Sequence, residues 1–330
     1  MKILRLNART FPMIDEERKI LHDANAELIE KELFSECFTP EEFDGVMIIS
    51  ACLRAADIRR LTKCRIIARL GNGCDKIDLT EAAKQGIAVA NVPDSFTVEV
   101  ADHTMALMLS ALRKLKPHEE MMRQGRRPEG TFGLHRLSSL TLGLIGFGRI
   151  GQMAAIRAQA FGMRVIVSDP ALTEEAAAKS GVERASFDTV LETADVVSLL
   201  CPLLPSTREM LTMKEFRRMK PTAILINTAR GELVNETDLA QALETGVIAG
   251  AGVDVFGGIN VFAEGGFSTD HPYFKVKNIQ LTPHVAANAE EAKIETFSRA
   301  AQYAVDGVNG IMPPFVVNRQ QLKEFGTCRI

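Results

Sequence analysis

A glycine-rich segment in the middle of the chain, LGLIGFGRIGQ at 142–152, has a spacing that can bind phosphate groups. Gly146, Gly148 and Gly151 follow an apolar run and open a helical pattern. In such a turn the first glycine permits a tight bend, the second lets the backbone approach a pyrophosphate, and the third lets helix and strand pack closely. Because the amide groups at a helix N-terminus also face the anion, this segment predicts a dinucleotide site.

An acidic residue, Asp169, closes the next apolar run and refines that prediction. A carboxylate at this place can accept hydrogen bonds from both ribose hydroxyls of adenosine, and it would repel a 2′-phosphate. The sequence therefore favours NAD over NADP. The alternative is a tight strand-to-helix turn that binds no ligand, followed by a turn-forming Asp-Pro pair. The regular order of the surrounding elements argues against that alternative.

The elements that must position this site are short apolar runs that alternate with helical patterns. The runs in the middle of the chain are 142–146, 164–169, 195–201, 223–227, 250–256 and 278–283. Such an alternation predicts an α/β fold with a Rossmann-type, doubly wound parallel sheet, in which ligands bind at the carboxyl edge. A second, N-terminal group of strand-like runs predicts a smaller α/β layer; it comprises 2–6, 46–50, 65–69 and 87–91, with helices expected at 15–31 and 79–85.

One strongly apolar helical pattern, 96–115, lies between the two groups. It predicts a helix buried on most sides, partly in a dimer interface, so we expect a homodimer. The polar and basic segment that follows, 116–136, is either a solvated excursion or an arm that lies on the partner subunit. A last helical pattern, 290–310, ends shortly before Pro313 and Pro314.

The composition limits the class of protein. The 330 residues carry a formal charge of −3, which gives no broad attraction to nucleic acid or to an anionic membrane. No apolar run approaches the roughly 20 residues that a membrane helix needs. The six cysteines have no CxxC spacing, and the histidines are equally scattered. We therefore expect a cytoplasmic protein without a metal site, with zinc ligation as the less favoured alternative.

Ordered motifs through almost the whole chain resemble the D-isomer-specific 2-hydroxyacid dehydrogenase family. That family includes phosphoglycerate dehydrogenase, glyoxylate/hydroxypyruvate reductase, phosphite dehydrogenase and the C-terminal binding protein corepressors. Besides the glycine turn, the motifs are IIARLGNGCDKIDL (66–79), NVPDSFTVEVADHTMALML (91–109), CPLLPSTREML (201–211), LINTARGELV (225–234), AGAGVDVF (249–256) and NIQLTPHVA (278–286). The resemblance implies an NAD-binding Rossmann domain at 97–289 and a discontinuous, flavodoxin-like substrate domain formed by 1–96 and 290–330.

The same resemblance implies a reaction, the interconversion of a D-2-hydroxy acid and a 2-oxo acid, and the residues that serve it. Arg230 falls on the family's catalytic arginine, whose planar fork can bind a carboxylate and polarise the adjacent carbonyl. His284 falls on the acid/base, which can deliver a proton near neutral pH. The loop that receives the substrate carboxylate falls on Leu70, Gly71 and Asn72, with Arg230 and His284 also in contact with the substrate.

The cofactor-binding positions come from the glycine turn, from Asp169 and from the resemblance. Asp254 falls where the family contacts the nicotinamide carboxamide, and Thr207 lies near the phosphates. The full expected set is Gly146, Gly148, Arg149, Ile150, Gly151, Asp169, Cys201, Pro202, Thr207, Thr228, Ala229, Asp254, His284 and Ala287. Asn7, Arg9, Cys52 and Leu70, which follow N-terminal strands, are expected to shape the substrate pocket.

The chain departs from the family pattern at the acid that should support His284. Five residues after Asp254, where that acid is expected, the chain has Ile259. It also has an insert before HPYF at 271–274, and alignment backwards from that element brings Glu264 close to the acid's place. Our hypothesis is that Glu264 is the partner of His284. Asp270, or no acid at all, is the alternative, and Glu264 would then be an ordinary glutamate in a surface loop.

Two functions remain compatible with these motifs. The first is an NAD-dependent oxidoreductase with Arg230 and His284 in the roles above. The second is a corepressor-like protein that senses NAD(H) and binds partner proteins with little or no turnover, because fold alone does not decide function. The chain keeps both Arg230 and His284 and lacks long tails, which favours the enzyme. Leu70 stands where phosphite dehydrogenase has a lysine, which argues against phosphite as the substrate.

Overall fold

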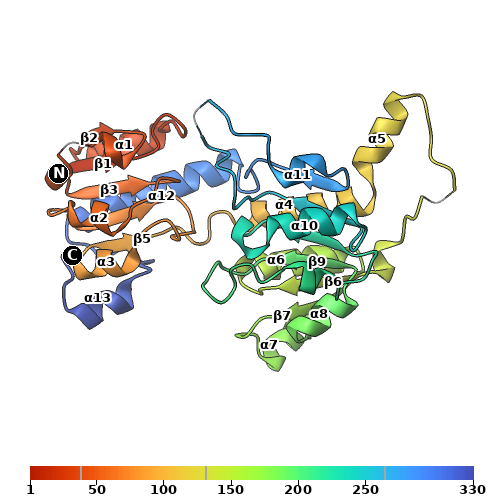
Figure 1. The fold of residues 1–330 in the computed structure, drawn as a ribbon. Helices are drawn as coiled ribbons and strands as arrows, with labels where there is room; N and C mark the ends of the chain where they lie inside the picture. The colour runs from red at the N-terminus through yellow and green to blue at the C-terminus, as the bar shows by residue number, and fades with distance from the viewer. Residues whose placement is uncertain (38, 131, 264) are drawn as a thin grey trace. The chain divides into compact units, whose positions relative to one another are not determined.

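The computed structural model describes residues 1–37, 39–130, 132–263 and 265–330. The chain forms two compact units, one made of 1–96 with 288–330 and the other of 97–287 (Figure 1). Each unit has its own parallel sheet with helices on both faces. The α/β fold that the sequence predicts is thereby confirmed.

The unit at 97–287 is built on a sheet with the strand order β12-β11-β10-β9-β6-β7-β8 among the described residues. The chain starts in the middle at β6, winds outwards to β8, and then crosses back to continue from β9 to β12, which is the doubly wound order. The strands are β6 (Thr141–Ile145), β7 (Arg164–Ser168), β8 (Glu183–Arg184), β9 (Val196–Leu199), β10 (Ile224–Asn227), β11 (Gly250–Val253) and β12 (Ile279–Leu281).

Helices cover both faces of this sheet because alternate side chains of each strand point to opposite faces. Leu142 and Leu144 of β6 belong to the core shared with α4 and α6, whereas Ile145 packs with α8, α9 and α10. The helices are α4 (Thr97–Leu112), α5 (Leu115–Arg123), α6 (Arg149–Ala160), α7 (Glu174–Lys179), α8 (Phe187–Thr193), α9 (Met213–Phe216), α10 (Glu236–Glu244) and α11 (Pro272–Lys275), with 3₁₀ turns η3 (Leu137–Ser139) and η4 (Gly231–Leu233).

The helix predicted at 96–115 is confirmed as α4, which is shorter than predicted at its C-terminal end. Helix α4 ends at Leu112, and Lys114 has a φ of 51°, in the left-handed region, so the chain turns before α5 begins at Leu115. The Nζ atom of Lys114 donates to the carbonyl oxygen of Phe132 at 2.7 Å, which stabilises the turn from the far end of the segment. The first part of the segment predicted as a polar excursion is therefore helical.

The unit at 1–96 and 288–330 has a smaller sheet, whose order within the described residues is β2-β1-β3-β4-β5. This is the flavodoxin-like order. Its elements are β1 (Lys2–Arg5), α1 (Asp15–Asp23), β2 (Glu27–Glu30), η1 (Phe34–Glu36), η2 (Pro40–Glu42), β3 (Gly45–Ile48), α2 (Ala55–Arg59), β4 (Ile66–Arg69), α3 (Leu79–Lys84), β5 (Ala88–Ala90), α12 (Glu290–Val308) and α13 (Arg319–Phe325).

The C-terminal helix α12 completes the core of this smaller unit. It packs against α1, β3 and β4 (Figure 1), and a Cβ atom added at Gly307 would lie 2.7 Å from Cβ of Ile66, so the helix backbone sits directly on the strand.

The helix predicted at 15–31 is wrong in its second half. Helix α1 ends at Asp23, Asn25 turns the chain with a φ of 51°, and β2 follows. Among the described helices, none is long and apolar enough to cross a membrane.

Candidate active site

The glycine turn joins β6 to α6 and leaves space at one position. A Cβ atom on Gly146, whose φ is 101°, would lie 2.7 Å from the backbone of Leu200, and one on Gly151 would lie 2.6 Å from the carbonyl oxygen of Gly146. A Cβ atom on Gly148 would meet nothing within 4 Å. Gly148 is the N-cap of α6 and offers no side chain to the first-turn amides, which begin with Arg149 and Ile150. Open space beside uncapped amides fits a pyrophosphate.

The carboxylate of Asp169 is fixed beside this turn. Directly after β7, its Oδ2 atom accepts from the amide of Phe147 at 2.7 Å, and Oδ1 accepts from the amide of Ala171 at 2.8 Å. Each carboxylate oxygen can accept a further hydrogen bond. Asp169 is half-buried. The arrangement leaves the carboxylate able to receive ribose hydroxyls at the end of β7.

The loop at 201–211 follows β9 and is held closed by its own threonine. The hydroxyl of Thr207 donates to the carbonyl oxygen of Pro202 at 2.8 Å and accepts from the amide of Leu204 at 2.8 Å. The sulfur of Cys201 lies 3.9 Å from that of Met210, and burial raises the pKa of the Cys201 thiol to about 11. Cys201 is therefore an uncharged packing residue at neutral pH.

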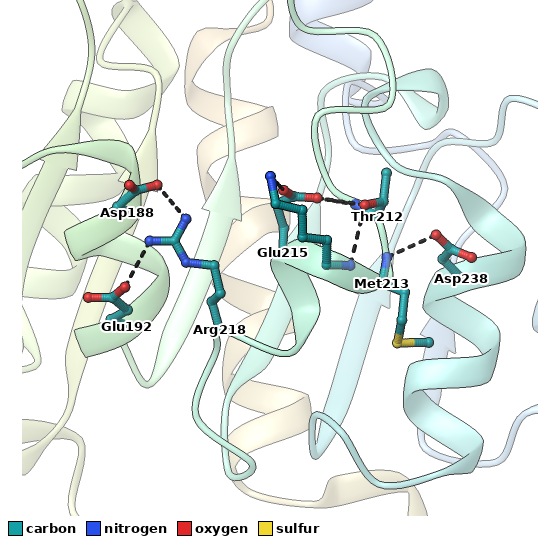
Figure 2. A network of polar contacts seen from close by, with 8 residues as sticks. Asp188, Glu192, Thr212, Met213, Glu215, Arg218 and Asp238 are labelled. Carbon is teal, nitrogen blue, oxygen red and sulfur yellow. Dashed lines mark hydrogen bonds and ion pairs between the residues drawn. The ribbon is translucent and has the colours of Figure 1, made fainter.

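A network of polar contacts fixes the segment that continues from this loop (Figure 2). The amide of Leu211 donates to the carbonyl of Leu233. Helix α9 follows with Thr212 as its N-cap, and the amide and hydroxyl of Thr212 donate to Oε2 of Glu215. The amide of Met213 donates to Oδ2 of Asp238 on α10 at 2.8 Å. Thus the loop after β9 is tied to the segment that follows β10.

On the other side of α9, the guanidinium of Arg218 pairs with two acids of α8. It lies 2.6 Å from Asp188 and 2.8 Å from Glu192 (Figure 2). The acidic partners are exposed, so these pairs contribute little stability individually. Their effect is to fix where the chain re-enters the sheet at β10.

Arg230 lies in a backbone turn at the carboxyl end of β10. The side chain of Asn227 closes the turn, because its Nδ2 donates to the carbonyl of Arg230 at 2.8 Å and its Oδ1 accepts from the amide of Ala229 at 3.1 Å. Thr228 is buried, and its hydroxyl lies 2.7 Å from that of Thr104 on α4. The Arg230 side chain is half-buried, with Nη1 donating to the carbonyl of Ala229 at 2.7 Å.

His284 follows β12 in a turn that is organised by Asp254. The amide of His284 donates to the carbonyl oxygen of Asp254 at 2.8 Å, and the Asp254 carboxylate accepts from the amides of Val285 at 2.9 Å and Ala286 at 3.0 Å. His284 has a φ of 57°, in the left-handed region that residues other than glycine seldom adopt. These contacts hold the residue there. Its half-buried ring lies 5.3 Å from the ring of Phe262, centre to centre.

The Asp254 carboxylate also contacts side chains. Its Oδ1 atom accepts from the hydroxyl of Thr282 at 2.6 Å, and Nε2 of His103 on α4 lies 2.9 Å from that hydroxyl and 3.5 Å from Oδ1. Asp254 is fully buried. The sequence predicts a contact between Asp254 and the cofactor, but not the role of Asp254 in the turn that carries His284. A Thr two residues before the histidine was the available signal.

The sequence predicts Glu264, or alternatively Asp270, as the acid that supports His284. Glu264 lies outside the described residues. Asp270 is exposed, and its carboxylate pairs with Nζ of Lys275 at 3.0 Å, which lowers the pKa of Asp270. A second acid near this segment, Glu236 on α10, is not predicted by the sequence. It pairs with His271 at 3.0 Å and accepts from the amides of Gly257 and Gly258.

The expected substrate loop belongs to the other unit. Leu70 is 1% exposed, and its amide donates to the carbonyl of Ile48 at 2.9 Å, while the amide of Gly71 donates to that of Arg69 at 2.9 Å. Nδ2 of Asn91 donates to the carbonyl of Asn72 at 2.8 Å. The Leu70 side chain is thus part of the core of this unit, and its place beside the substrate stays a prediction.

The other pocket-shaping residues expected in that unit have visible local roles. Oδ1 of Asn7 accepts from the amides of Ser50 and Ala51, both at 2.8 Å, so this side chain holds the loop after β3. Arg9 pairs with Glu36 at 3.2 Å, and Cys52 is exposed. The role visible for Asn7 is therefore to position the backbone of the loop after β3.

Comparison with known proteins identifies the family. Residues 105–286 match the model of the D-isomer-specific 2-hydroxyacid dehydrogenase NAD-binding domain. A glyoxylate reductase of Thermococcus litoralis is 38% identical over 79% of this chain and 78% of its own length. The chain belongs to the D-isomer-specific 2-hydroxyacid dehydrogenase family.

Other relatives agree with this assignment. A D-3-phosphoglycerate dehydrogenase of Bacillus subtilis is 34% identical over 84% of this chain, which spans about half (51%) of that longer protein. A D-lactate dehydrogenase of Aquifex aeolicus, solved with NAD and lactic acid, has a TM-score of 0.84 at 26% identity and covers 98% of both chains. This dehydrogenase therefore uses NAD, as its glycine turn and Asp169 predict.

Proposed function

We propose that this dehydrogenase reduces a 2-oxo acid to a D-2-hydroxy acid, and catalyses the reverse reaction, with Arg230 and His284 as the residues that handle the substrate. Arg230 follows β10 and His284 follows β12. Ligands of open α/β sheets bind at this carboxyl edge. The observation that carries the proposal is the left-handed backbone of His284, held in place by Asp254, because strained backbone is maintained where function requires it.

The residues divide the chemistry as follows. Bound NADH supplies the hydride that reduces the carbonyl carbon. The Arg230 guanidinium binds the substrate carboxylate through its planar fork and polarises the adjacent carbonyl. The imidazole of His284 donates a proton to the carbonyl oxygen as it becomes a hydroxyl, and in the oxidation direction it accepts that proton from the hydroxyl.

The cofactor would be held by groups around the glycine turn. The open space at Gly148 and the first-turn amides of α6 support a pyrophosphate position there. The Asp169 carboxylate would accept the adenosine ribose hydroxyls, and the loop at 201–211 would lie beneath the cofactor. Thr228, Ala229, Asp254 and Ala287 complete the proposed set.

Two further parts of the site are proposed from the resemblance. The backbone at 70–72 would receive the substrate carboxylate, with Asn72 as its most accessible member, because the amides of Leu70 and Gly71 already donate to protein carbonyls. Glu264 would hydrogen-bond the His284 imidazole and favour its charged form. Glu264→Gln should then lower kcat for reduction and move the basic limb of the pH profile to lower pH. Asp270→Asn should leave both unchanged.

We also propose that the protein is a cytosolic homodimer. On α5, Leu115 is 55% exposed and Met122 is 76% exposed, which suits a helix that lies against a second subunit. Each of the six cysteines lies in the described part of the chain and is a free thiol, which suits a reducing compartment. Light scattering should give twice the chain mass of 36.2 kDa. A monomer at micromolar concentration would contradict the dimer.

The direct test of the proposed reaction is oxidation of NADH with a panel of 2-oxo acids that differ in side-chain size and charge. Steady turnover with at least one acid supports the proposal. Tight NADH binding with no turnover on any acid would instead support a sensor related to the corepressor branch. His284→Gln should abolish turnover and leave NADH binding intact.

A further inference from the structure

The insert that follows Asp254 begins and ends at one carboxylate. Glu236, the first residue of α10, accepts from the amide of Gly257 at 2.9 Å and from the amide of Gly258 at 3.0 Å. Its Oε2 atom also lies 3.0 Å from Nε2 of His271. Residues 257 and 271 bound the insert, so Glu236 fixes the positions of both its ends.

We call the contacts of Glu236 with Gly257, Gly258 and His271 the clamp. Its hydrogen bonds determine which nitrogen of His271 carries the proton, and its atoms are closely packed. Nδ1 of His271 accepts from the amide of Tyr273 at 3.3 Å, so the ring carries a proton on Nε2 and donates it to Glu236. The side chains of His271 and Glu236 are 8% and 13% exposed. A Cβ atom on Gly258 would lie 3.2 Å from Glu236 and 3.3 Å from His271, which leaves little room for another residue there. The clamp therefore constrains the backbone at both ends of the insert.

Between these ends, the insert brings an aromatic ring to His284. The rings of Phe262 and His284 lie 5.3 Å apart, centre to centre, and are tilted by 49°. Another phenylalanine of the insert, Phe267, packs elsewhere: it stacks on Phe274 at 6.2 Å and is 40% exposed. The two phenylalanines thus have different surroundings within one loop and provide a matched comparison.

We propose that Phe262 is a positioning residue for the imidazole of His284, and that Glu236 acts through the insert to keep it in place. A histidine side chain can turn about two bonds, and proton transfer requires one orientation of the ring. An aromatic neighbour restricts that choice by contact and can take no part in the proton transfer itself. This role rests on the proposed function of His284, and it assigns a task to an insert that the family pattern leaves unexplained.

The kinetic test compares Phe262→Ala with Phe267→Ala. Phe262→Ala should lower kcat about tenfold, the effect expected from loss of one aromatic contact, with little change in the Kd for NADH. Phe262→Leu, which retains apolar bulk, should recover part of the loss, and Phe267→Ala should keep the parent kcat. Equal kcat values for the two alanine variants would overturn the proposal.

A second readout does not depend on turnover. The His284 ring signals in a ¹H–¹³C spectrum, assigned with His284→Gln, should move in Phe262→Ala because the ring current of Phe262 is lost, and they should stay in place in Phe267→Ala. Unmoved His284 signals in Phe262→Ala would overturn the proposal even if kcat fell. Moved signals in a protein without turnover on any 2-oxo acid would support the contact and reject the proposed function.

The role of Glu236 is tested by a separate pair of variants. Glu236→Gln keeps the size of the side chain and loses an acceptor, so it should shift the His284 signals and lower kcat in the same direction as Phe262→Ala. Glu244→Gln, at the exposed end of the same helix, is the control and should change neither. A Glu236→Gln variant with parent kcat and parent His284 signals would remove Glu236 from the proposal.

Discussion

The carboxylate and carbonyl of Asp254 hold the backbone around His284. The carbonyl accepts from the amide of His284 at 2.8 Å, and the carboxylate accepts from the next two amides, of Val285 and Ala286, at 2.9 Å and 3.0 Å. A buried carboxylate with well-placed donors is a strong constraint, because an amide left without its acceptor is costly. The end of β11 therefore determines where the residue after β12 lies.

Asp254→Asn should destabilise this turn. The new amide group would place N–H donors where the backbone amides also donate, so we expect the free energy of unfolding to fall by about 1–3 kcal/mol. Because His284 is carried by the same turn, kcat should fall as well. Urea unfolding and steady-state kinetics on one preparation measure both effects.

Asp195→Asn is the matched control for that variant. Asp195 accepts from the amide of Thr141 at 2.8 Å and pairs with Lys220 at 2.8 Å, directly before β9 and hence at the opposite edge of the sheet. It should lower stability without a proportionate fall in kcat. If both variants lost kcat in proportion to stability, Asp254 would have no particular role in positioning His284.

Asp169→Ala should narrow the preference for NAD over NADP. The variant loses a charged acceptor for the ribose hydroxyls, a contact whose loss should cost about tenfold or more in kcat/KM with NADH. It also removes the repulsion of a 2′-phosphate, so NADPH should gain relative to NADH. Parallel measurements of kcat/KM with the two cofactors decide this, and an unchanged ratio would exclude Asp169 from cofactor selection.

Arg230→Lys should lower kcat/KM for the 2-oxo acid by about 100-fold. An ammonium group retains the charge but cannot reproduce the planar, bidentate geometry of a guanidinium, so KM should rise and kcat should fall. The Kd for NADH should change little. Parent kcat/KM in this variant would refute the assigned role of Arg230.

Cys201 should resist alkylation at pH 8. Burial raises the pKa of its thiol to about 11, so the reactive thiolate is scarce there and its share grows as the pH rises towards that value. Cys52 and Cys328 are exposed and provide an internal comparison. Peptide mapping after brief iodoacetamide treatment should find these two modified first. Modification of Cys201 at the same rate as Cys328 would contradict its buried, uncharged state.

The sequence predicts the larger sheet well because its strands are short apolar runs buried on both faces. Strand β8 does not follow this pattern, because Glu183 and Arg184 are both charged and exposed. They form a strand only through pairing with β7. The segment ELIE at 27–30 is an edge strand with no strong apolar signal, and for that reason it resembled the continuation of a helix.

In the site, too, the sequence predicts the features that depend on neighbouring residues and misses those that depend on contacts between distant residues. Gly146, Gly148 and Gly151 are recognisable because their roles depend on neighbouring residues. The pair Glu236 and His271 joins residues 35 positions apart, and its contact with the insert depends on how α10 packs beside α11. Likewise, TPH at 282–284 identifies the histidine but does not reveal its left-handed backbone, which depends on Asp254 from another strand.

The proposal that His284 serves as the acid/base for D-2-hydroxy acids is tested most directly by the rate of NAD reduction with the separated enantiomers of small 2-hydroxy acids, such as lactate and glycerate. The rate is measured in wild-type protein and in His284→Gln. We expect turnover with a D-enantiomer, much slower turnover with its L-counterpart, and loss of turnover in the variant. Equal rates with both enantiomers, or activity that survives His284→Gln, would contradict it.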